Sequence, residues 1–385
     1  MATRNYVPRA MDEGTIGTKK KKWKAGYFGE VHAENTYTKT EVDELNTAQT
    51  NALNESINEL KEDAKDVVGV MLAKEGLKSG IWLHINKAGR MIPRPNFDEL
   101  YPWNAIEAVT FDGQAMVKIP KFYHKYENKC RWISKEPREG YHLHPAFIRN
   151  GEEKSCFYIG AYEAYNADSA AGSAAGKTPW VSVGGLASAI NSCTARNTNA
   201  NDPNKRGWHL QTIYERAAIS LLMLIEYATT DMQAEIGNGS QSTIVATGTS
   251  NAKWRGLSEW WGNVWEHTDG FKTDAEGKAQ IFSNACDGTY VQTNVTVAAG
   301  WITDVSVAKG EAYDLADVFI PVTADAVEVN ATYADYAWAA ANSVLHQSDC
   351  FGHGTYCGPF SFAVNYAATV SLTYLGLRLA KYADN

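Results

Sequence analysis

Apolar residues recur at spacings of three and four, or their sums, along a polar stretch near the start of the chain. Just before them, Thr38 and Glu41 have the T-x-x-E spacing of a capping box, in which each residue bonds a backbone amide of the other. A narrow apolar seam is typical of a coiled coil, so we predict a self-associating helical stalk at 38–75. The seam residues are Val42, Leu45, Leu53, Ile57, Leu60, Ala64, Val67 and Met71.

Two features weaken this seam. Asn46, Gln49 and Thr50 interrupt it with polar side chains. The step from Leu45 to Leu53 departs from a strict heptad and would shift the seam or locally unwind a supercoil. A single amphipathic helix lying on the next domain is therefore the alternative to a coiled coil.

The pattern changes to short runs typical of strands in residues 76–150, which we expect to be a β-rich lead-in. Residues 116–126 alternate over part of their length, and 127–129 form a plausible hairpin turn before 130–133. A further strand is expected at 157–164. The lead-in is therefore predicted to contain β-strands, and a further strand is predicted to follow it.

One strong helix is predicted in the second half of the chain, at 212–236. Thr212 and Glu215 form another capping box, apolar residues line one face, and Gly237 is expected to end the helix. Residues 285–340 are rich in Val, Thr, Ala and Asp and predict an inserted β-rich loop or flap.

A possible metal motif occurs in the lead-in. His142 and His144 form an H-x-H pair that could hold a metal on one face of a strand, but no third ligand is evident nearby in sequence. Ordinary packing is the favoured interpretation, so no metal and no cofactor are predicted.

Charge and cysteine usage narrow the class of protein. The formal net charge of -8 argues against nucleic acid as a general partner. No window of 18 apolar residues exists, and the N-terminus has no apolar secretion segment, so no membrane insertion is expected. The six cysteines lack C-x-x-C spacing, which favours reduced thiols in a protein made in a cytoplasm.

The run from Leu345 to Lys381 has an unusual composition. Between Ser348 and Tyr374 there is no Lys, Arg, Glu, Gln, Met or Trp, and Asp349 is the only residue of formal charge, although 21% of the whole chain is charged. Tyr, Phe, His, Ser and Gly dominate, as in antibody binding loops. A buried C-terminal hairpin would also be uncharged and aromatic, so both interpretations stand on composition alone.

Four phrases in order carry a resemblance to a known family. They are F-Y-I-G-A-Y-E from Phe157, W-H-L-Q-T-I-Y-E-R-A-A from Trp208, G-N-V-W-E from Gly262 and L-G-L-R-L-A from Leu375. Together they resemble the C-type lectin fold of the formylglycine-generating (sulfatase-modifying) type, over about residues 151–385. The resemblance implies an α+β fold for this domain, and the N-terminal residues 1–37 resemble the attachment regions of phage tail fibres.

The family has an enzymatic branch, which oxidises a substrate cysteine with a copper-binding cysteine pair. Cys350 and Cys357 lie in about the right region, and thiolates suit Cu(I). However, they are spaced more widely than the family's pair, and the stretch that follows lacks the usual Arg residues. The sequence therefore favours a protein that is not an enzyme.

The other branch is a binding branch, which includes variable proteins diversified by retroelements. The frame of those proteins resembles Gly358, Phe360, Asn365, Ala367, Ser371, Gly376 and Arg378 here. Their variable positions arise from Asn codons whose first two bases are randomised, which cannot yield Lys, Glu, Gln, Met or Trp. The resemblance implies that the variable, ligand-binding positions are Asp349, Phe351, His353, Tyr356, Tyr366, Leu372 and Tyr374.

These observations predict a receptor-binding protein of a phage or prophage tail fibre, located in the virion and made in the host cytoplasm. The expected partners are a host cell-surface glycan or protein, two further copies of the chain in a homotrimer, and other tail proteins at the N-terminus. The sequence lacks E-P-N and Q-P-D, so no calcium is expected at the ligand. A formylglycine-generating copper oxidase and a non-variable structural tail or baseplate component remain as alternatives.

Overall fold

The computed structural model describes residues 38–240 and 242–384, and for residues 56–65 it describes the backbone alone. Two compact units divide the chain, at residues 1–56 and 57–385. The predicted attachment region at 1–37 lies outside the described residues, as do the seam side chains of Ile57, Leu60 and Ala64.

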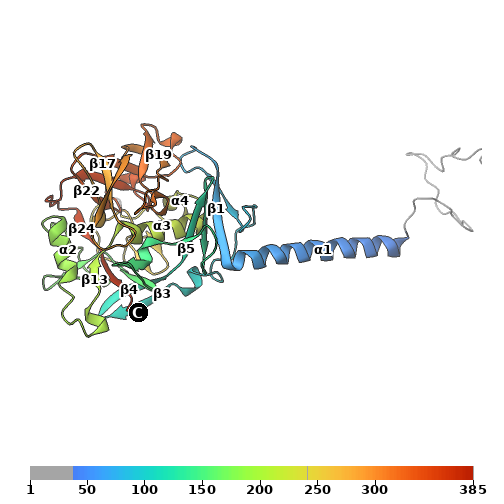
Figure 1. Cartoon of the computed structure of the whole chain (residues 1–385), viewed down its shortest axis with the longest axis horizontal. Coiled ribbons are helices and arrows are strands. Elements are labelled where there is room, and N and C mark those ends of the chain that lie inside the picture. The colour runs from blue at the N-terminus through green and yellow to red at the C-terminus, as the bar shows by residue number, and fades with distance from the viewer. Residues whose placement is uncertain (1–37, 241, 385) are drawn as a thin grey trace, which may run out of the picture. The chain divides into compact units, whose positions relative to one another are not determined.

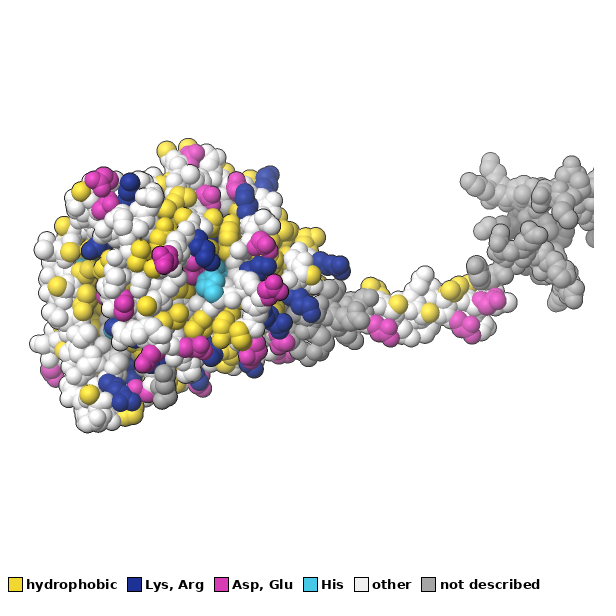
Figure 2. Space-filling view, in the orientation of Figure 1, with side chains coloured by type: hydrophobic (Ala, Val, Ile, Leu, Met, Phe, Trp, Pro, Cys, Tyr) yellow, Lys and Arg dark blue, Asp and Glu magenta, His cyan; other side chains and the backbone are white. Residues whose placement is uncertain are grey.

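Helix α1 (Lys39–Asp66) occupies most of the predicted stalk. Its capping box is confirmed, because the Glu41 amide donates to Thr38 Oγ1 at 3.2 Å and the Thr38 amide donates to Glu41 Oε2 at 2.6 Å. Val42 and Leu53 on this helix are 41% and 62% exposed. Figure 2 shows apolar and acidic side chains along the described part of α1. No helix among the described residues is long and apolar enough to cross a membrane.

The helix is shorter than predicted. It ends at Asp66, and strand β1 (Val67–Lys74) follows directly, so Val67 and Met71 belong to a sheet and not to a stalk reaching residue 75. The run Val67-Val68-Gly69-Val70 explains this end, since β-branched residues and glycine favour strand over helix. A spacing of four fits a strand face as well as a helix face.

The first sheet is antiparallel throughout and has the order β2-β1-β6-β5-β7. The predicted hairpin is confirmed: Glu127 pairs with Cys130, and Asn128 and Lys129 both adopt positive φ in the turn. Besides β1, its strands are β2 (Ile81–Ile85), β5 (Tyr123–Glu127), β6 (Cys130–Ser134) and β7 (His142–Leu143).

The second sheet brings together segments that are far apart in the chain, in the order β13-β25-β10-β4-β3. Strand β10 contains the first half of the predicted strand at 157–164, because it ends at Gly160. The members are β3 (Glu107–Phe111), β4 (Gln114–Pro120), β10 (Cys156–Gly160), β13 (Trp208–Leu210) and β25 (Leu379–Tyr382). Strand β25 lies inside this sheet, hydrogen-bonded to both β10 and β13.

The third and largest sheet has the order β18-β17-β16-β22-β23-β21-β19-β20, with β24 also pairing with β16. Its strands are β16 (Trp265–Thr273), β17 (Lys278–Phe282), β18 (Tyr290–Thr296), β19 (Gly300–Val305), β20 (Pro321–Asp325), β21 (Tyr336–Ala339), β22 (Val344–Gln347), β23 (Phe362–Tyr366) and β24 (Leu375–Leu377). Residues 285–340 therefore form no separate flap: β21 pairs with β23, and β18 pairs with β17. The β-branched residues of this segment form strands, as predicted. Periodicity in the sequence does not show which distant strands they pair with.

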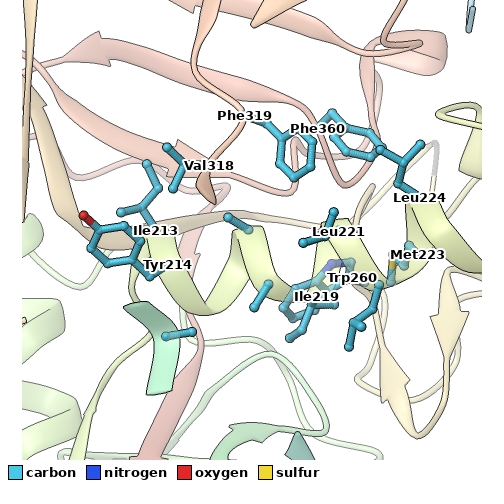
Figure 3. Close-up of a cluster of buried hydrophobic side chains, with 14 of the residues drawn as sticks. Ile213, Tyr214, Ile219, Leu221, Met223, Leu224, Trp260, Val318, Phe319 and Phe360 are labelled. Carbon is cyan, nitrogen blue, oxygen red and sulfur yellow. The ribbon is translucent and has the colours of Figure 1, made fainter. Parts of the chain in front are cut away.

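The long buried helix is α3 (Ile213–Tyr227), and it lies among the sheets of the compact unit (Figure 1). Its capping box at Thr212 is confirmed, but the helix ends well before Gly237, because Ala228 adopts the left-handed conformation with φ 50°. Figure 3 shows Ile219 and Trp260 on one side of α3 and Phe319 and Phe360 on the other. The helix is buried along its length from Ile213 to Glu226, which makes it the centre of the main hydrophobic core.

Smaller elements connect these parts. The further helices are α2 (Leu186–Thr194), α4 (Met232–Glu235) and the 3-10 helices η1 (Trp103–Ala105), η2 (Pro145–Phe147), η3 (Pro203–Lys205), η4 (Leu315–Asp317), η5 (Glu328–Asn330) and η6 (Gly354–Tyr356). Two-stranded pairs are formed by β8 (Ile148–Arg149) with β9 (Glu152–Glu153), β11 (Tyr165–Ala167) with β12 (Ala170–Gly172), and β14 (Lys253–Trp254) with β15 (Leu257–Ser258). The described chain is thus mainly β-structure with few helices.

Candidate functional site

The loop between β22 and β23 leaves the third sheet through a sharp turn and is fixed at its base. Ser348 and Asp349 have φ of 82° and 58°, an uncommon conformation for residues other than glycine. The Phe351 amide then donates to the carbonyl oxygen of Asn263 at 3.1 Å. The loop contains η6 and returns to the sheet at Phe362, so its tip is held by backbone bonds on a rigid support.

Asp349 corrects one predicted contact position, because its side chain is fully buried beneath the loop. The left-handed turn directs the carboxylate inward, where Oδ1 accepts from the Cys350 amide at 2.6 Å and lies 2.5 Å from His353 Nδ1. Burial raises the pKa of Asp349, and the bond to Asp349 raises the pKa of His353. This ion pair fixes the loop conformation. Asp349 therefore supports the predicted ligand-binding surface from beneath and is not one of its contact residues.

The other six predicted positions all retain solvent exposure. Tyr356 is 37% exposed, and none of the remaining five is fully buried: Phe351, His353, Tyr366, Leu372 and Tyr374. None of the six belongs to the core cluster around α3. The predicted hairpin does form, as the antiparallel pair of β22 with β23, and its residues Leu345, Phe362 and Val364 lie in that core. The six positions lie outside the core.

These side chains gather around two aromatic residues that sequence analysis missed. His353 and Tyr356 lie 5.6 and 5.8 Å from Trp338, between ring centroids, and Tyr356 lies 4.6 Å from Tyr336. Phe351, Leu372 and Tyr374 pack on the same small cluster as Trp338. We call the following set the aromatic patch: Tyr336, Trp338, Phe351, His353, Tyr356, Tyr366, Leu372 and Tyr374.

Trp338 and Tyr336 project from β21, which pairs in parallel with β23. Their i, i+2 spacing is a strand signal that was present in the sequence, within the segment interpreted as a flap. Tyr366 joins the patch through its contact with the hydroxyl of Tyr374, whose pKa is raised by burial and by this hydrogen bond. The patch contains no Lys, Arg, Glu or Asp, whereas the face of the protein in Figure 2 carries many charged side chains.

A buried network of charged side chains supports the segment from behind. Glu266 Oε2 lies 2.6 Å from Arg216 Nη1, and Glu266 Oε1 accepts from Arg378 Nε at 2.8 Å, with all three side chains fully buried. Both guanidinium groups lie over the Trp260 ring, at 4.1 and 5.1 Å from its centroid. Burial lowers the pKa of Arg216 to about 10. Neighbouring Glu163 is also buried, and burial together with Glu266 raises its pKa.

Each of the four sequence phrases contributes to this network. The first supplies Glu163, which accepts from Asn263 Nδ2 of the third phrase at 2.6 Å. The second supplies Arg216, the third also supplies Glu266, and the fourth supplies Arg378. Ionised side chains are buried only when they are paired and hydrogen-bonded. Glu266 pairs with Arg216 and Arg378, and Glu163 joins the network through its hydrogen bond with Asn263.

The two cysteines of the loop are buried and reduced. Cys357 Sγ lies 3.4 Å from the carbonyl oxygen of Cys350. Burial raises the pKa of the Cys350 thiol to about 12, and it also raises the pKa of Cys357. Both groups are thus thiols at neutral pH, and neither has the lowered pKa of an activated nucleophile.

The structural neighbours of the chain include two distantly related proteins. No protein-family model and no curated protein matches the chain. Treponema denticola variable protein 1 is 14% identical, with a TM-score of 0.35 over 72% of this chain and 98% of that one. PvdO from Pseudomonas aeruginosa is 12% identical, with a TM-score of 0.26 over 72% of this chain and 97% of its own. Both TM-scores are below 0.5, so the function is inferred from this chain's own residues.

Proposed function

We propose that the protein is an adhesin, the receptor-binding protein of a phage or prophage tail fibre. Its C-terminal region would be a C-type lectin-like domain of the formylglycine-generating type that displays a variable surface. The observation that carries the proposal is the aromatic patch: half-exposed rings on a fixed loop and a sheet, without a Lys, Arg, Asp or Glu side chain among them. Monomeric proteins seldom expose such apolar groups together unless they contact a partner.

The patch binds by burying ring faces and by hydrogen bonds from tyrosine hydroxyls. Tyr and Trp provide large contact areas at small entropic cost, because each has only two side-chain torsions to fix. The ion pair of Asp349 with His353 and the backbone bonds at the loop base keep the rings in place before binding. Preorganisation of this kind raises affinity without any new contact. No catalytic step and no cofactor is needed.

The ligand is a glycan or protein on the host cell surface. Rings stack on the apolar faces of sugars as readily as on protein side chains, and the patch has no Lys, Arg, Asp or Glu that would select a charged ligand; His353 is paired with the buried Asp349. We further propose a homotrimer joined through α1, where Val42, Leu45 and Leu53 are exposed in the single chain. Three patches on one fibre convert weak single contacts into strong attachment through effective concentration. Residues 1–37 would join other tail proteins.

Substitution of the patch tests the proposal. Full-length protein is applied to a panel of intact bacterial cells and to a glycan array, and the Tyr356→Ala and Trp338→Ala variants are compared with wild type. We expect each to weaken binding about tenfold or more, as for truncated aromatic hot spots. Tyr141→Ala is the matched control, because Tyr141 packs on a different apolar cluster. Unchanged binding by the Tyr356→Ala and Trp338→Ala proteins would exclude the patch as the binding surface.

Two alternatives have their own tests. Copper content and oxidation of a cysteine-containing peptide would identify a formylglycine-generating oxidase, for which Cys350 and Cys357 are the candidate residues. A non-variable structural tail or baseplate component would bind no cell or glycan. A reverse transcriptase gene, with an imperfect repeat of the coding segment for residues 345–381, would support the variable adhesin.

A further inference from the structure

Three polar side chains from distant parts of the chain meet away from the aromatic patch. His124 lies on β5, His142 on β7 and Asp317 at the end of η4. Asp317 Oδ1 is 2.8 Å from His124 Nδ1 and 2.7 Å from His142 Nε2, and Asp317 Oδ2 is 2.9 Å from His142 Nε2. The cluster thus brings two imidazoles and one carboxylate within 4.8 Å of one another.

The fold places these groups by pairing and capping. His124 and His142 are direct partners across the antiparallel pair β5 and β7, so their rings share one face. Asp314 caps η4 by accepting from the Ala316 amide at 3.1 Å, which sets the turn that presents Asp317. The cluster therefore rests on regular backbone elements, as a preformed site requires.

His144 positions this cluster without joining it. Its Nδ1 accepts from the Ala146 amide at 3.2 Å, so Nε2 carries the proton and donates to the backbone oxygen of Asp317 at 3.0 Å. Both ring nitrogens of His144 are occupied. The H-x-H motif seen in the sequence thus supplies one possible ligand, His142, and one residue that holds the Asp317 backbone.

The hydrogen bonds of the cluster leave one buried atom without a partner. His124 is fully buried, and its Nε2 has no hydrogen-bond partner among the described residues. This unmet nitrogen costs about 1–3 kcal/mol. An ion bound through Nδ1 would leave it unmet, so the case for a site rests on the distances among His124, His142 and Asp317.

We propose that His124, His142 and Asp317 form a binding site for one divalent transition-metal ion of the Zn²⁺ class. Imidazole and carboxylate are the ligands that such ions prefer, at about 2.0–2.2 Å. Ligand atoms at that distance from a tetrahedral ion stand about 3.4 Å apart, so the observed separations of 2.7–2.9 Å would have to open by about 0.6 Å. The His142 side chain is 37% exposed, which leaves water access and an open coordination position on that side.

Two positive groups lie close to the site, Lys309 and Arg131, and the Lys309 ammonium is paired with Asp314 at 3.0 Å. The Arg131 guanidinium donates to the backbone oxygen of Ala316 and lies between the rings of Tyr126 and Phe319, at 4.9 and 4.7 Å. The carbonyl group and the ring faces stabilise this charge locally. A bound ion would connect the lead-in sheet to the segment that contains η4, two parts of the chain that no strand pair joins in that region. This role is structural and independent of the proposed function.

Metal titration of the full-length protein tests the site. Protein freed of metal with EDTA is dialysed and titrated with ZnSO₄, and bound zinc is measured together with the unfolding temperature. We expect one equivalent of zinc to be retained and the unfolding temperature to rise by about 2 °C or more. Co²⁺ in place of zinc should give visible absorption bands from nitrogen and oxygen ligands, a readout that needs no variant.

Variants locate the ion. His142→Gln should abolish the temperature rise and the retained zinc, and because His142 is partly exposed, this variant should fold. His353→Gln is the matched control, a histidine of similar exposure from the other group of ligand-type side chains, Asp349, Cys350 and His353. It should bind zinc as wild type does, and loss of zinc from this variant would place the ion at that group and overturn the proposal. Absence of retained zinc and of cobalt bands in the wild type would overturn the proposal, and so would an equal temperature rise in the His142→Gln protein.

Discussion

Replacement of Arg378 by lysine should destabilise the protein strongly although the charge is kept. The fully buried guanidinium makes four hydrogen bonds: Nε to Glu266 Oε1 at 2.8 Å, Nη1 to the Gly160 oxygen at 3.0 Å, and Nη2 to the oxygens of Ser258 and Glu259 at 3.1 and 2.7 Å. These four oxygen acceptors are arranged around the planar guanidinium group, whose N–H donors have fixed directions. A lysine ammonium is a single point on a flexible chain and cannot reach all of them.

The cost follows from the acceptors left without a donor. A hydrogen bond that involves a charged group contributes about 1.5–3 kcal/mol, and an unsatisfied buried acceptor costs about 1–3 kcal/mol. If lysine retains the contact with Glu266 and one carbonyl oxygen, two carbonyl oxygens lose their donor. We therefore expect the Arg378→Lys substitution to lower the free energy of unfolding by about 3–5 kcal/mol, as for broken buried ion pairs.

Urea unfolding of full-length protein, followed by tryptophan fluorescence, measures this loss. The matched control is Arg138→Lys, because the pair of Arg138 with Asp66 is exposed and 3.5 Å long, so we expect a change of about 0–1 kcal/mol. If the Arg378→Lys and Arg138→Lys proteins unfold within about 1 kcal/mol of each other, the fork geometry is not what stabilises the network.

Three further outcomes are expected. Gly358→Ala should lower the unfolding temperature, because an added Cβ would lie 2.1 Å from Asp335 Oδ1; unchanged thermal unfolding would contradict this. Burial lowers the pKa of His267 to about 4, so stability should fall as pH drops from about 6.5 towards 4. Between pH 7 and pH 5 the loss should be about 2 kcal/mol, and His267→Leu should remove that part of the pH dependence in urea unfolding. Leu53→Glu should give monomers in sedimentation if α1 forms the trimer, and a monomeric wild type would refute self-association.

Structural features that are determined by residues close together in the sequence could be predicted. The capping boxes at Thr38 and Thr212 and the hairpin turn at 127–129 were found because each is decided within four residues. The ends of the two long helices were not found. The end at Ala228 depends on a left-handed alanine, which no composition rule signals. The end at Asp66 has a local signal in the run 67–70, but the spacing of four from Val67 to Met71 also fits a helix, and the strand is completed by pairing about 65 residues further along the chain.

In the candidate site, too, features set by local sequence were predicted and features set by distant residues were not. Composition marked the whole segment through its absence of Lys and Glu, and the family resemblance picked out the six positions within it that keep solvent exposure. It could not distinguish Asp349, whose inward direction follows from two positive φ angles. Trp338 was missed because its contact with the loop requires the parallel pairing of β21 with β23. The third ligand-type residue near His142 is 175 residues away in the chain, beyond any local motif.

The position of β25 inside the second sheet has a consequence for synthesis. A chain made from its N-terminus completes β10 about 220 residues before β25 is available to pair with it. At about 5–20 residues per second, the edge of β10 stays open for about 10–45 s. An unpaired edge of this kind can join the edge of another unfinished chain. How much soluble protein a cell obtains should therefore depend on what shields β10 during that interval.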